Sequence, residues 1–282
     1  MSVLIVGSTS VIGRAIAARL EARCVVKTAG RREADFHFDL SRWQELPAVS
    51  ESFDVVVHVA ADFGGEGDPD MVRAEVVNAA GTLSACALAR QVGARHFVLM
   101  SSIFATYRAG DPYYGIYALS KRHGEDVARL HCAAGGMDLT ILRPSQVYDD
   151  RGDCRRHQGL FYMMADRAQA GEEITLYGAH DARRNYIHLD DLAETVARVV
   201  DQRCIGEYAC AHPRSVRLGE MAQAAFAAFD QDRQARFLPD KPALSDLPEI
   251  DDFALYDRID FWPRIDVAQG YRRIRACREA GA

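Results

Sequence analysis

Apolar positions in the first half of the chain follow two alternating spacings, which predict strands and helices in turn. Short β-branched runs at 3–6 and 54–61 are typical of buried parallel strands, whereas residues 14–20 carry apolar side chains at helical spacing. The alternation continues to about residue 147. It predicts an α/β fold, a Rossmann-type doubly wound parallel sheet with right-handed crossovers.

The second half of the chain has a less regular pattern. Prolines at 239, 242, 248 and 263 indicate irregular structure toward the C-terminus. Helical spacing and short apolar runs predict helices near 157–171, 189–203 and 216–230, and strands at 174–176 and 207–209.

A glycine-containing turn, GSTSVIG at residues 7–13, joins the first strand to the first helix. The free N–H groups and positive dipole end of a helix N-terminus favour a pyrophosphate there. Gly7 allows a tight turn and Gly13 a close approach, while Ser10 replaces the middle glycine of the usual dinucleotide fingerprint. A turn that binds nothing is the alternative, but the flanking strand and helix favour cofactor contacts at Gly7, Ser10, Val11, Ile12 and Gly13.

Two arginines follow the second predicted strand, 24–28, where an NAD-binding protein would carry a carboxylate for the adenosine ribose. Arg31 and Arg32 suit a ribose 2′-phosphate, because a guanidinium binds phosphate through forked, charge-assisted hydrogen bonds. The sequence therefore favours NADP over NAD, with a solvated basic turn as the alternative. Asp39, after the third strand, could bind the adenine amino group or cap a helix beginning near Ser41.

Tyr117 and Lys121 are four residues apart and share one face of a predicted helix. Tyrosine is a poor base at neutral pH, with an ordinary pKa of ~10. We expect the nearby lysine to favour the phenolate and lower this pKa, so that the pair can transfer a proton. Ordinary amphipathic helices share this spacing, and the preceding nucleotide-binding pattern gives the pair its weight.

These features occur in the order typical of the extended short-chain dehydrogenase/reductase family, and the chain resembles its NAD-dependent epimerase/dehydratase group, which modifies nucleotide-sugars. The resemblance runs nearly end to end. Besides the glycine turn and the Tyr117–Lys121 pair, it rests on His-x-Ala-Ala at 58–61, Asn-x-x-Gly-Thr at 78–82, Ser-Ser at 101–102, the strand 139–144, and the segments 184–193, 261–263 and 270–271.

The resemblance implies that Tyr117 is the general acid/base, that Ser102 binds the same substrate oxygen, and that Lys121 holds the nicotinamide ribose. It implies an NAD or NADP cofactor with further contacts at Leu40, Val59, Ala60, Ala61, Asn78 and Pro144. The implied substrate contacts are Ser102, Ile103, Gln146 and Arg184, with Arg184 at the diphosphate of a nucleotide-sugar.

The resemblance also implies a domain arrangement and a homodimer. Residues 1–147, with 184–205 returning to them, would bind the dinucleotide, and 148–183 with 206–282 would form a small mixed C-terminal substrate-binding cap. The loop 62–68 follows the fourth strand at the edge where ligands bind in such sheets. We expect substrate contact there, with a plain surface loop as the alternative.

Several positions depart from the family pattern. Sugar-nucleotide 4,6-dehydratases carry Asp-Glu after the serine or threonine, where this chain has Ile103 and Phe104, so the sequence argues against the dehydratase reaction. Gln146 stands where a substrate-binding asparagine is usual, and residues 149–157 are unusually charged. These departures concern the substrate more than the cofactor.

Composition indicates which partners the protein can bind and in which cellular compartment it is expected. A net charge of −6 disfavours nucleic acid, which requires a basic face. No apolar run approaches the ~20 residues of a membrane helix, and Met1 and Ser2 lead directly into the first strand without a signal peptide. Seven cysteines without Cys-x-x-Cys spacing predict reduced thiols in a cytoplasmic protein and no zinc site. His58 and His188 are expected to be structural rather than metal ligands.

The sequence leaves three functions open. The first is an NAD(P)-dependent oxidoreductase or epimerase that acts on a nucleotide-linked sugar by hydride transfer; the arginine pair favours reduction and the family favours epimerisation. The second is an NADPH-dependent reductase of a small non-nucleotide carbonyl compound. The third is a non-catalytic NADP-binding regulator, which the retained Ser102, Tyr117 and Lys121 disfavour.

Overall fold

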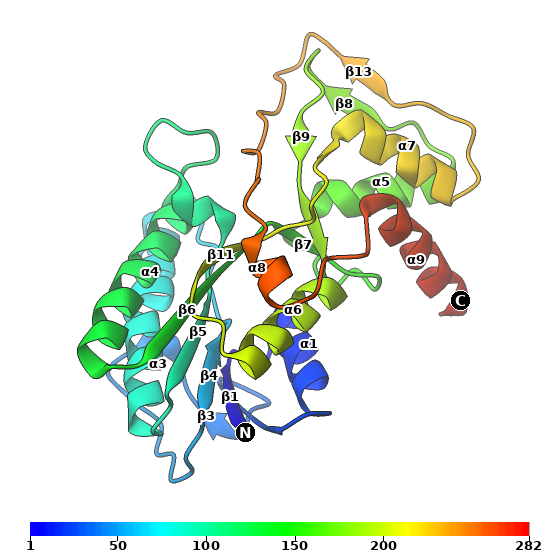
Figure 1. Ribbon diagram of the computed structural model, residues 1–282. Coiled ribbons are helices and arrows are strands. Elements are labelled where there is room, and N and C mark those ends of the chain that lie inside the picture. Colours follow the sequence, from blue (N-terminus) through cyan, green and yellow to red (C-terminus); the bar gives the residue numbers. More distant parts are fainter. Residues whose placement is uncertain (282) are drawn as a thin grey trace. The chain divides into compact units, whose positions relative to one another are not determined.

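The central feature of the computed structural model, which describes residues 1–281, is a seven-stranded sheet (Figure 1). Its spatial order is β11-β6-β5-β4-β1-β2-β3, and the pairs from β3 through β6 are parallel. This confirms the predicted Rossmann-type doubly wound sheet. The strands are β1 (Ser2–Val6), β2 (Val25–Gly30), β3 (Phe36–His37), β4 (Val55–His58), β5 (His96–Met100), β6 (Asp138–Pro144) and β11 (Gly206–Cys210).

The strand order reverses between β1 and β4, which lie next to each other in the sheet. Ligands of open α/β sheets bind outside the carboxyl ends of the strands at such a switch point. Here the backbone N–H groups of Val59 and Ala60, just after β4, donate to the carbonyl of Val6 at the end of β1, at 2.9 and 3.1 Å. The glycine turn and the segment after β4 are therefore neighbours.

Helices and short helical turns accompany the sheet, and α3 and α4 lie side by side (Figure 1). Apolar residues of the central strands, such as Leu4, Val56 and Phe97, pack with Leu88 of α3 and Ala128 of α4 in one buried cluster. The elements are α1 (Val11–Leu20), η1 (Leu40–Arg42), α2 (Asp68–Glu75), η2 (Val76–Ala80), α3 (Gly81–Gln91), η3 (Ile103–Thr106), α4 (Ile116–Gly135), α6 (Leu189–Gln202) and α8 (Ala254–Arg258).

The remaining elements belong to a smaller mixed part of the chain. The helices predicted near 157–171, 189–203 and 216–230 are confirmed as α5, α6 and α7. Phe161 and Tyr271 stack in the core of this part, with ring centroids 4.5 Å apart. Its elements are β7 (Gln146–Tyr148), α5 (Gly159–Ala170), β8 (Thr175–Tyr177), β9 (Arg183–Arg184), β10 (Tyr186–His188), β12 (Val216–Arg217), α7 (Leu218–Ala228), β13 (Arg236–Leu238) and α9 (Val267–Ala280).

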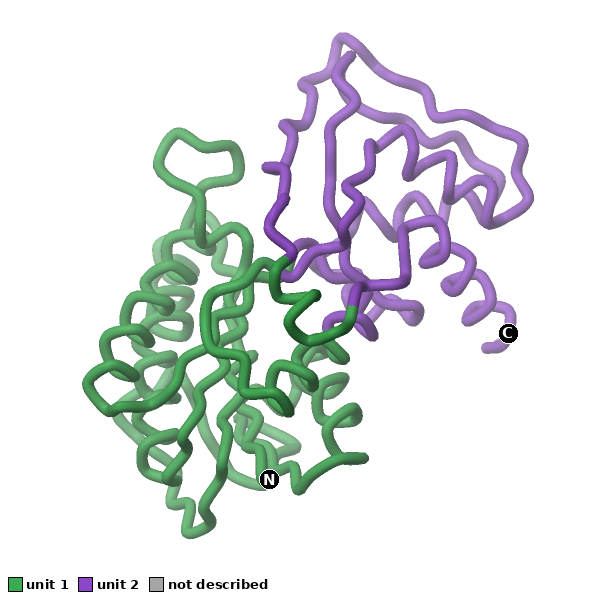
Figure 2. Tube along the Cα trace, in the orientation of Figure 1, with its two compact units in different colours: residues 1–144, 193–209, 254–261 green, residues 145–192, 210–253, 262–282 purple. Residues whose placement is uncertain are grey.

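The chain divides into two compact units, each discontinuous in sequence (Figure 2). Unit 1 comprises residues 1–144, 193–209 and 254–261, and unit 2 comprises 145–192, 210–253 and 262–282. These units differ from the predicted domains in four segments. Residues 145–147 and 184–192 lie in unit 2 rather than with the dinucleotide-binding part, and 206–209 and 254–261 lie in unit 1 rather than in the cap.

Pairing between short strands explains the displaced boundaries. In unit 2, β7 pairs in parallel with β10, and β9 pairs antiparallel with β12, which holds residues 183–188 there. By contrast, β11 extends the main sheet beside β6. Strands of two or three residues carry no readable hydrophobic period, so the sequence could not assign them to a partner.

The sequence made one prediction about the cysteines and one about membrane-spanning segments. All seven cysteines are free thiols. Among residues 1–281, none of the helices combines the length and apolarity that crossing a bilayer would require.

Candidate active site

The glycine turn after β1 is shaped by close contacts. Gly7 has a φ of +121°, and a side-chain carbon there would lie 2.9 Å from the backbone nitrogen of Ala60. A side-chain carbon at Gly13 would lie 2.5 Å from the carbonyl oxygen of Gly7. Ser10 caps α1, because its Oγ accepts a hydrogen bond from the Gly13 N–H at 3.3 Å. The serine that departs from the fingerprint thus stabilises the helix end at which a pyrophosphate would bind.

The basic turn after β2 is tied to the glycine turn. The hydroxyl of Ser8 donates to the carbonyl of Arg32 at 2.7 Å. Arg31 and Arg32 are exposed, and within residues 1–281 neither guanidinium forms a hydrogen bond or ion pair. Glu33 follows Arg32 directly and is exposed, and Asp35 is held by the Lys27 ammonium at 3.0 Å. The structure therefore leaves two unpaired cations beside the candidate cofactor turn.

Asp39 has the capping role that the sequence offered as one alternative. Its Oδ1 accepts from the backbone N–H of Ser41 at 3.0 Å and from the Ser41 hydroxyl at 2.8 Å, at the start of η1. Burial opposes ionisation of Asp39, but these hydrogen bonds outweigh it and lower its pKa. Leu40, the next residue, is buried. Contacts of either residue with adenine stay a prediction.

The structure brings together the three predicted catalytic residues. Ser102 follows β5 and begins η3, while Tyr117 and Lys121 occupy the first turns of α4. The Ser102 hydroxyl lies close enough to the Tyr117 phenol to act on its pKa, which it lowers. Lys121 donates from Nζ to the carbonyl of Met100 at 2.6 Å. The end of β5 is therefore where a hydroxyl, a phenol and an ammonium group meet.

The pKa of Tyr117 shifts in the direction opposite to the prediction. Burial raises it to about 12, although the neighbouring Ser102 hydroxyl opposes the shift. Burial also lowers the pKa of Lys121 to about 8, partly offset by the charge of Glu125. The expected lowering by Lys121 was wrong for this geometry, because the ammonium donates to the Met100 carbonyl instead of stabilising a phenolate.

Two aromatic rings enclose Tyr117, and sequence reasoning missed both. Phe63 stacks on its face with ring centroids 4.7 Å apart and an interplanar angle of 10°. Phe104 meets it edge-on at 6.4 Å. Phe63 belongs to the loop 62–68, for which the sequence offered substrate contact or a plain surface loop. An aromatic residue between an acid and two glycines was the available signal.

Asn78 joins that loop to α4. Its Oδ1 accepts from the Asp62 N–H at 2.8 Å, and its Nδ2 donates to the Asp62 carbonyl at 2.7 Å and to the Ser120 hydroxyl at 2.9 Å. The side chain is buried. These hydrogen bonds give the Asn78 side chain a structural role, because they connect the loop to α4. The cofactor contact predicted for Asn78 stays a prediction.

Other predicted cofactor positions follow the strands. Val59 is buried, Ala60 half-buried and Ala61 exposed directly after β4, and Pro144 is buried at the end of β6. Val11 and Ile12 are half-buried in the first turn of α1. These residues stand at carboxyl ends of strands or at a helix N-terminus, and their contact with a cofactor stays a prediction.

The predicted substrate residues of unit 2 differ in their surroundings. Arg184 is buried, and its Nη1 donates to the carbonyls of Arg183 and Ser245 at 2.8 and 2.7 Å. Gln146 donates from Nε2 to Oε1 of Gln158 at 3.0 Å. The Oε1 of Gln146 is buried and has no hydrogen-bond partner in the described part of the chain. Such an acceptor is suited to a ligand hydroxyl.

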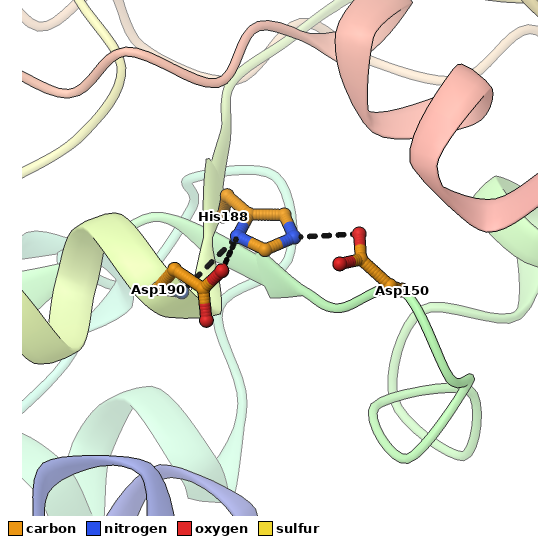
Figure 3. A group of neighbouring side chains, drawn as sticks. All are labelled: Asp150, His188 and Asp190. Carbon is orange, nitrogen blue, oxygen red and sulfur yellow. Dashed lines mark hydrogen bonds and ion pairs between the residues drawn. The ribbon is translucent and has the colours of Figure 1, made fainter. Parts of the chain in front are cut away.

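A second cluster of titratable groups lies in unit 2, where ligand atoms of Asp150, His188 and Asp190 fall within 4.8 Å of one another (Figure 3). His188 bonds Asp150 through Nε2 at 2.9 Å and accepts the Asp190 N–H through Nδ1 at 3.1 Å. Arg273 donates to both carboxylates at 2.7 Å. The guanidinium offsets one of the two negative charges, and the four side chains form an ion-pair network.

His58 is a packed core residue, as predicted. It is buried, and its Nε2 is 3.1 Å from the Thr82 hydroxyl. Burial lowers its pKa to about 3, helped by the charge of Lys121. The imidazole is therefore neutral at physiological pH.

Comparison with known protein families identifies the class of protein to which this fold and candidate site belong. The chain belongs to the NAD dependent epimerase/dehydratase family, whose sequence profile matches residues 3–209. It is 31% identical over 150 residues to a dTDP-4-dehydro-6-deoxy-D-allose reductase from a Streptomyces species, covering 52% of this chain and 46% of that protein. The chain thus spans about half the length of the curated relatives it matches over this region.

Solved structures with low sequence identity share the fold. A UDP-glucose 4-epimerase from Thermotoga maritima, solved with UDP-glucose, matches with a TM-score of 0.80 at 16% identity, covering 100% of both chains. RMD from Pseudomonas aeruginosa, complexed with NADPH, matches with a TM-score of 0.78 at 18% identity, covering 100% of this chain and 98% of that one. At these identities the likeness shows the fold.

Proposed function

We propose that the protein is an NAD(P)-dependent reductase of a nucleotide-linked keto-sugar, with Tyr117 as the proton donor. The observation that supports this proposal most is the convergence of Ser102, Tyr117 and Lys121 at the end of β5. The nicotinamide cofactor, when bound, supplies the hydride. The protein supplies orientation and one proton.

In the proposed reaction, Ser102 holds the substrate carbonyl oxygen through its hydroxyl, and Tyr117 donates its phenolic proton to that oxygen. Lys121 holds the ribose of the cofactor. A pKa of about 12 keeps Tyr117 protonated at neutral pH, which suits donation. An epimerase would need Tyr117 to accept a proton first, so this pKa favours the reductase over the epimerase.

The cofactor preference we propose is NADP. Arg31 and Arg32 are exposed and unpaired within residues 1–281, and Asp35 is held by Lys27. A ribose 2′-phosphate would find two guanidinium groups there, whereas an unphosphorylated ribose would lack the usual carboxylate.

The 4,6-dehydratase reaction stands outside the proposal. Ile103 is buried, and Phe104 contacts the rings of Tyr107 and Tyr117 at 5.1 and 6.4 Å. Neither side chain can carry a proton, while dehydration needs an acid and a base beside the tyrosine. Water loss from dTDP-glucose in the presence of the enzyme and NAD would contradict this exclusion.

A small non-nucleotide carbonyl substrate is the second candidate, and the surroundings of Arg184 favour it. The guanidinium proposed to bind a diphosphate is buried and donates to two backbone carbonyls. Replacing Arg184 with Gln should weaken binding of a nucleotide-sugar strongly and of a small carbonyl little. Equal loss for both substrates would leave Arg184 a purely structural residue.

A homodimer in the cytoplasm completes the proposal. Large apolar side chains are exposed on three successive helices, Val72 on α2, Leu83 on α3 and Leu130 on α4. An apolar surface on adjacent helices is suited to a symmetric partner. The free thiols agree with a reducing compartment. Sedimentation of a single monomeric species at micromolar concentration would exclude the dimer.

Replacing Tyr117 with Phe tests the mechanism. We expect turnover to be abolished and cofactor affinity to stay within about twofold, because only the proton donor is removed. The matched control is Tyr114→Phe, since Tyr114 lies just before α4 and its hydroxyl accepts a hydrogen bond from Arg122 of that helix at 3.3 Å. Steady-state rates and cofactor titration of both variants measure the difference, and retained turnover in Tyr117→Phe would end the mechanism.

Ligand stabilisation identifies the substrate class. NAD, NADP and sugars linked to UDP, GDP, CDP or dTDP are compared by the melting temperature of the protein. A ligand at a hundred times its dissociation constant adds ~2.7 kcal/mol to the free energy of unfolding. A shift with NADP and one nucleotide-sugar supports the proposal, a shift with NAD alone favours the epimerase, and a cofactor shift without any nucleotide response favours the small carbonyl.

A further inference from the structure

Phe63 covers one face of the ring that carries the proposed proton donor. The rings of Phe63 and Tyr117 are nearly parallel, at 10°, with centroids 4.7 Å apart. Phe104 contacts Tyr117 from another direction, at 64° and 6.4 Å. The Ser102 hydroxyl lies beside the phenol end and acts to lower its pKa. One face, one edge and the hydroxyl of Tyr117 therefore each have a defined neighbour.

The backbone next to Phe63 is pressed against the start of α4. Gly64 has a φ of +72°, and a side-chain carbon there would lie 2.6 Å from Cγ2 of Ile116, the residue before Tyr117. A residue other than glycine would be strained by this conformation and would also collide with Ile116. The chain thus passes close enough to α4 for the Phe63 ring to reach Tyr117.

Asp62 anchors the other side of Phe63. Its carboxylate accepts from the Gly64 N–H at 2.7 Å and from Nε of Arg73 at 2.7 Å. Its backbone N–H and carbonyl are both bonded to the amide of Asn78, which also bonds Ser120 of α4. Phe63 is therefore held between two residues that are each fixed against neighbouring helices.

We propose that Phe63 is a positioning residue that fixes the orientation of the Tyr117 ring for proton transfer. This inference rests on the proposed role of Tyr117 and extends it to a residue with no polar group of its own. Proton transfer requires the phenol oxygen to stay within hydrogen-bonding reach of the substrate oxygen. With Phe63 stacked on its face, the Tyr117 ring keeps one orientation, and its hydroxyl stays directed toward Ser102.

Three substitutions distinguish the effect of aromatic stacking from that of a bulky apolar side chain. Phe63→Leu keeps an apolar side chain but removes the ring, whereas Phe63→Tyr keeps the ring. Glu66→Ala is the matched control, because Glu66 is exposed on the same loop and forms no hydrogen bond or ion pair within residues 1–281. Phe63 is itself 47% exposed, so its replacement is compatible with folding.

The first readout is nuclear magnetic resonance of protein carrying labelled tyrosine, with Tyr117→Phe used to assign the signal. A ring stacked on Tyr117 displaces its ring resonances upfield. We expect that displacement to vanish in Phe63→Leu and to persist in Phe63→Tyr and Glu66→Ala. An unchanged Tyr117 signal in Phe63→Leu would overturn the proposal. This measurement needs no substrate, so it stays decisive even if the proposed activity is absent.

The second readout separates binding from chemistry. We expect Phe63→Leu to lower kcat on the order of tenfold with cofactor KM unchanged, since a misdirected phenol affects the transition state more than cofactor binding. Phe63→Tyr should restore kcat to within about twofold of the original enzyme. Loss of the stacking signal without any fall in kcat would also overturn the positioning role. A wild-type protein that stacks but reduces nothing would refute the proposed function, not the stack.

Discussion

Tyr117 and Lys121 lie on the same helix, but burial shifts their pKa values in opposite directions. A buried phenol stays protonated more readily, and a buried ammonium loses its proton more readily, because both environments favour the neutral form. At neutral pH the pair is therefore a neutral acid next to a cation. This state suits the proton donation proposed for Tyr117.

The low pKa of Lys121 has a consequence for stability. The difference between about 8 in the folded protein and its ordinary 10.5 corresponds to ~3 kcal/mol of unfavourable burial of the charged form at pH 7. A methionine would remove this cost but leave the Met100 carbonyl without its donor, a loss of ~1 kcal/mol. Replacing Lys121 with Met should therefore raise the free energy of unfolding by ~2 kcal/mol at pH 7. Urea unfolding as a function of pH measures this.

The sign of the pH dependence is opposite to that of a lysine in an ion pair. Between pH 8 and 10.5 the folded protein has lost the Lys121 proton while the unfolded chain retains it, so stability of the original protein rises with pH. The advantage of Lys121→Met should shrink across this window. An advantage that is constant from pH 7 to pH 10.5 would contradict the shifted pKa.

The two exposed arginines after β2 give a second prediction at the same scale. Replacing either Arg31 or Arg32 with Ala should weaken NADP binding about tenfold, because each loses a charge-assisted contact worth ~1.5 kcal/mol, and should leave NAD binding unchanged. Arg42→Ala is the control, since that guanidinium is exposed and pairs with Glu45. Calorimetric titration compares the variants, and an equal loss for NAD would argue against a 2′-phosphate site.

At the scale of elements, Ser10 belongs both to the glycine turn and to the N-terminal cap of α1. Ser10 replaces a fingerprint glycine yet caps the helix through Gly13. Ser10→Ala should lower the free energy of unfolding by ~1 kcal/mol, and Ser10→Gly by only a few tenths, because glycine is tolerated at an N-cap.

Thermal unfolding of the two Ser10 variants, with and without cofactor, checks both parts of this prediction. Cofactor stabilisation should survive in Ser10→Gly, which restores the usual fingerprint. A larger loss for Gly than for Ala would mean that the backbone conformation, rather than the cap, depends on the serine.

The elements also show where prediction from sequence succeeded. Long periodic helices such as α5, α6 and α7 were found within a few residues, because their spacing is a local property. The two- and three-residue strands β7, β9, β10 and β12 were not found, since only their partners make them strands. Residues 184–188 were consequently placed with the dinucleotide-binding part, whereas they fall in unit 2.

At the scale of the whole molecule, Arg273 connects segments of unit 2 that are far apart in the sequence. This side chain on α9 holds Asp150 and Asp190, and Asp150 in turn holds the buried His188 (Figure 3). Arg273→Gln should lower the free energy of unfolding by ~1 kcal/mol at pH 7, because two carboxylates lose their cation in a partly exposed site.

The neighbouring Arg272 is a matched control for this prediction, since it is exposed and makes no ion pair in the described residues. Burial opposes ionisation of Asp150, but its bonds to His188 and Arg273 lower its pKa overall. The effect of Arg273→Gln should therefore be complete above the ordinary pKa of 3.8 and should fade as pH drops below it. Chemical unfolding at pH 7 and pH 3 measures it, and equal losses in both variants would contradict the link.

The sequence by itself determined the class of fold and the position of the candidate site. Buried strands and amphipathic helices have periods that the chain carries locally, and the glycine turn and the Tyr117–Lys121 spacing lie within single elements. Only the tertiary structure decided that Phe63 stacks on Tyr117 and that Lys121 donates to Met100, at 2.6 Å. The physical reason is that a partner from another segment, and the burial it brings, set the orientation and the pKa of a side chain.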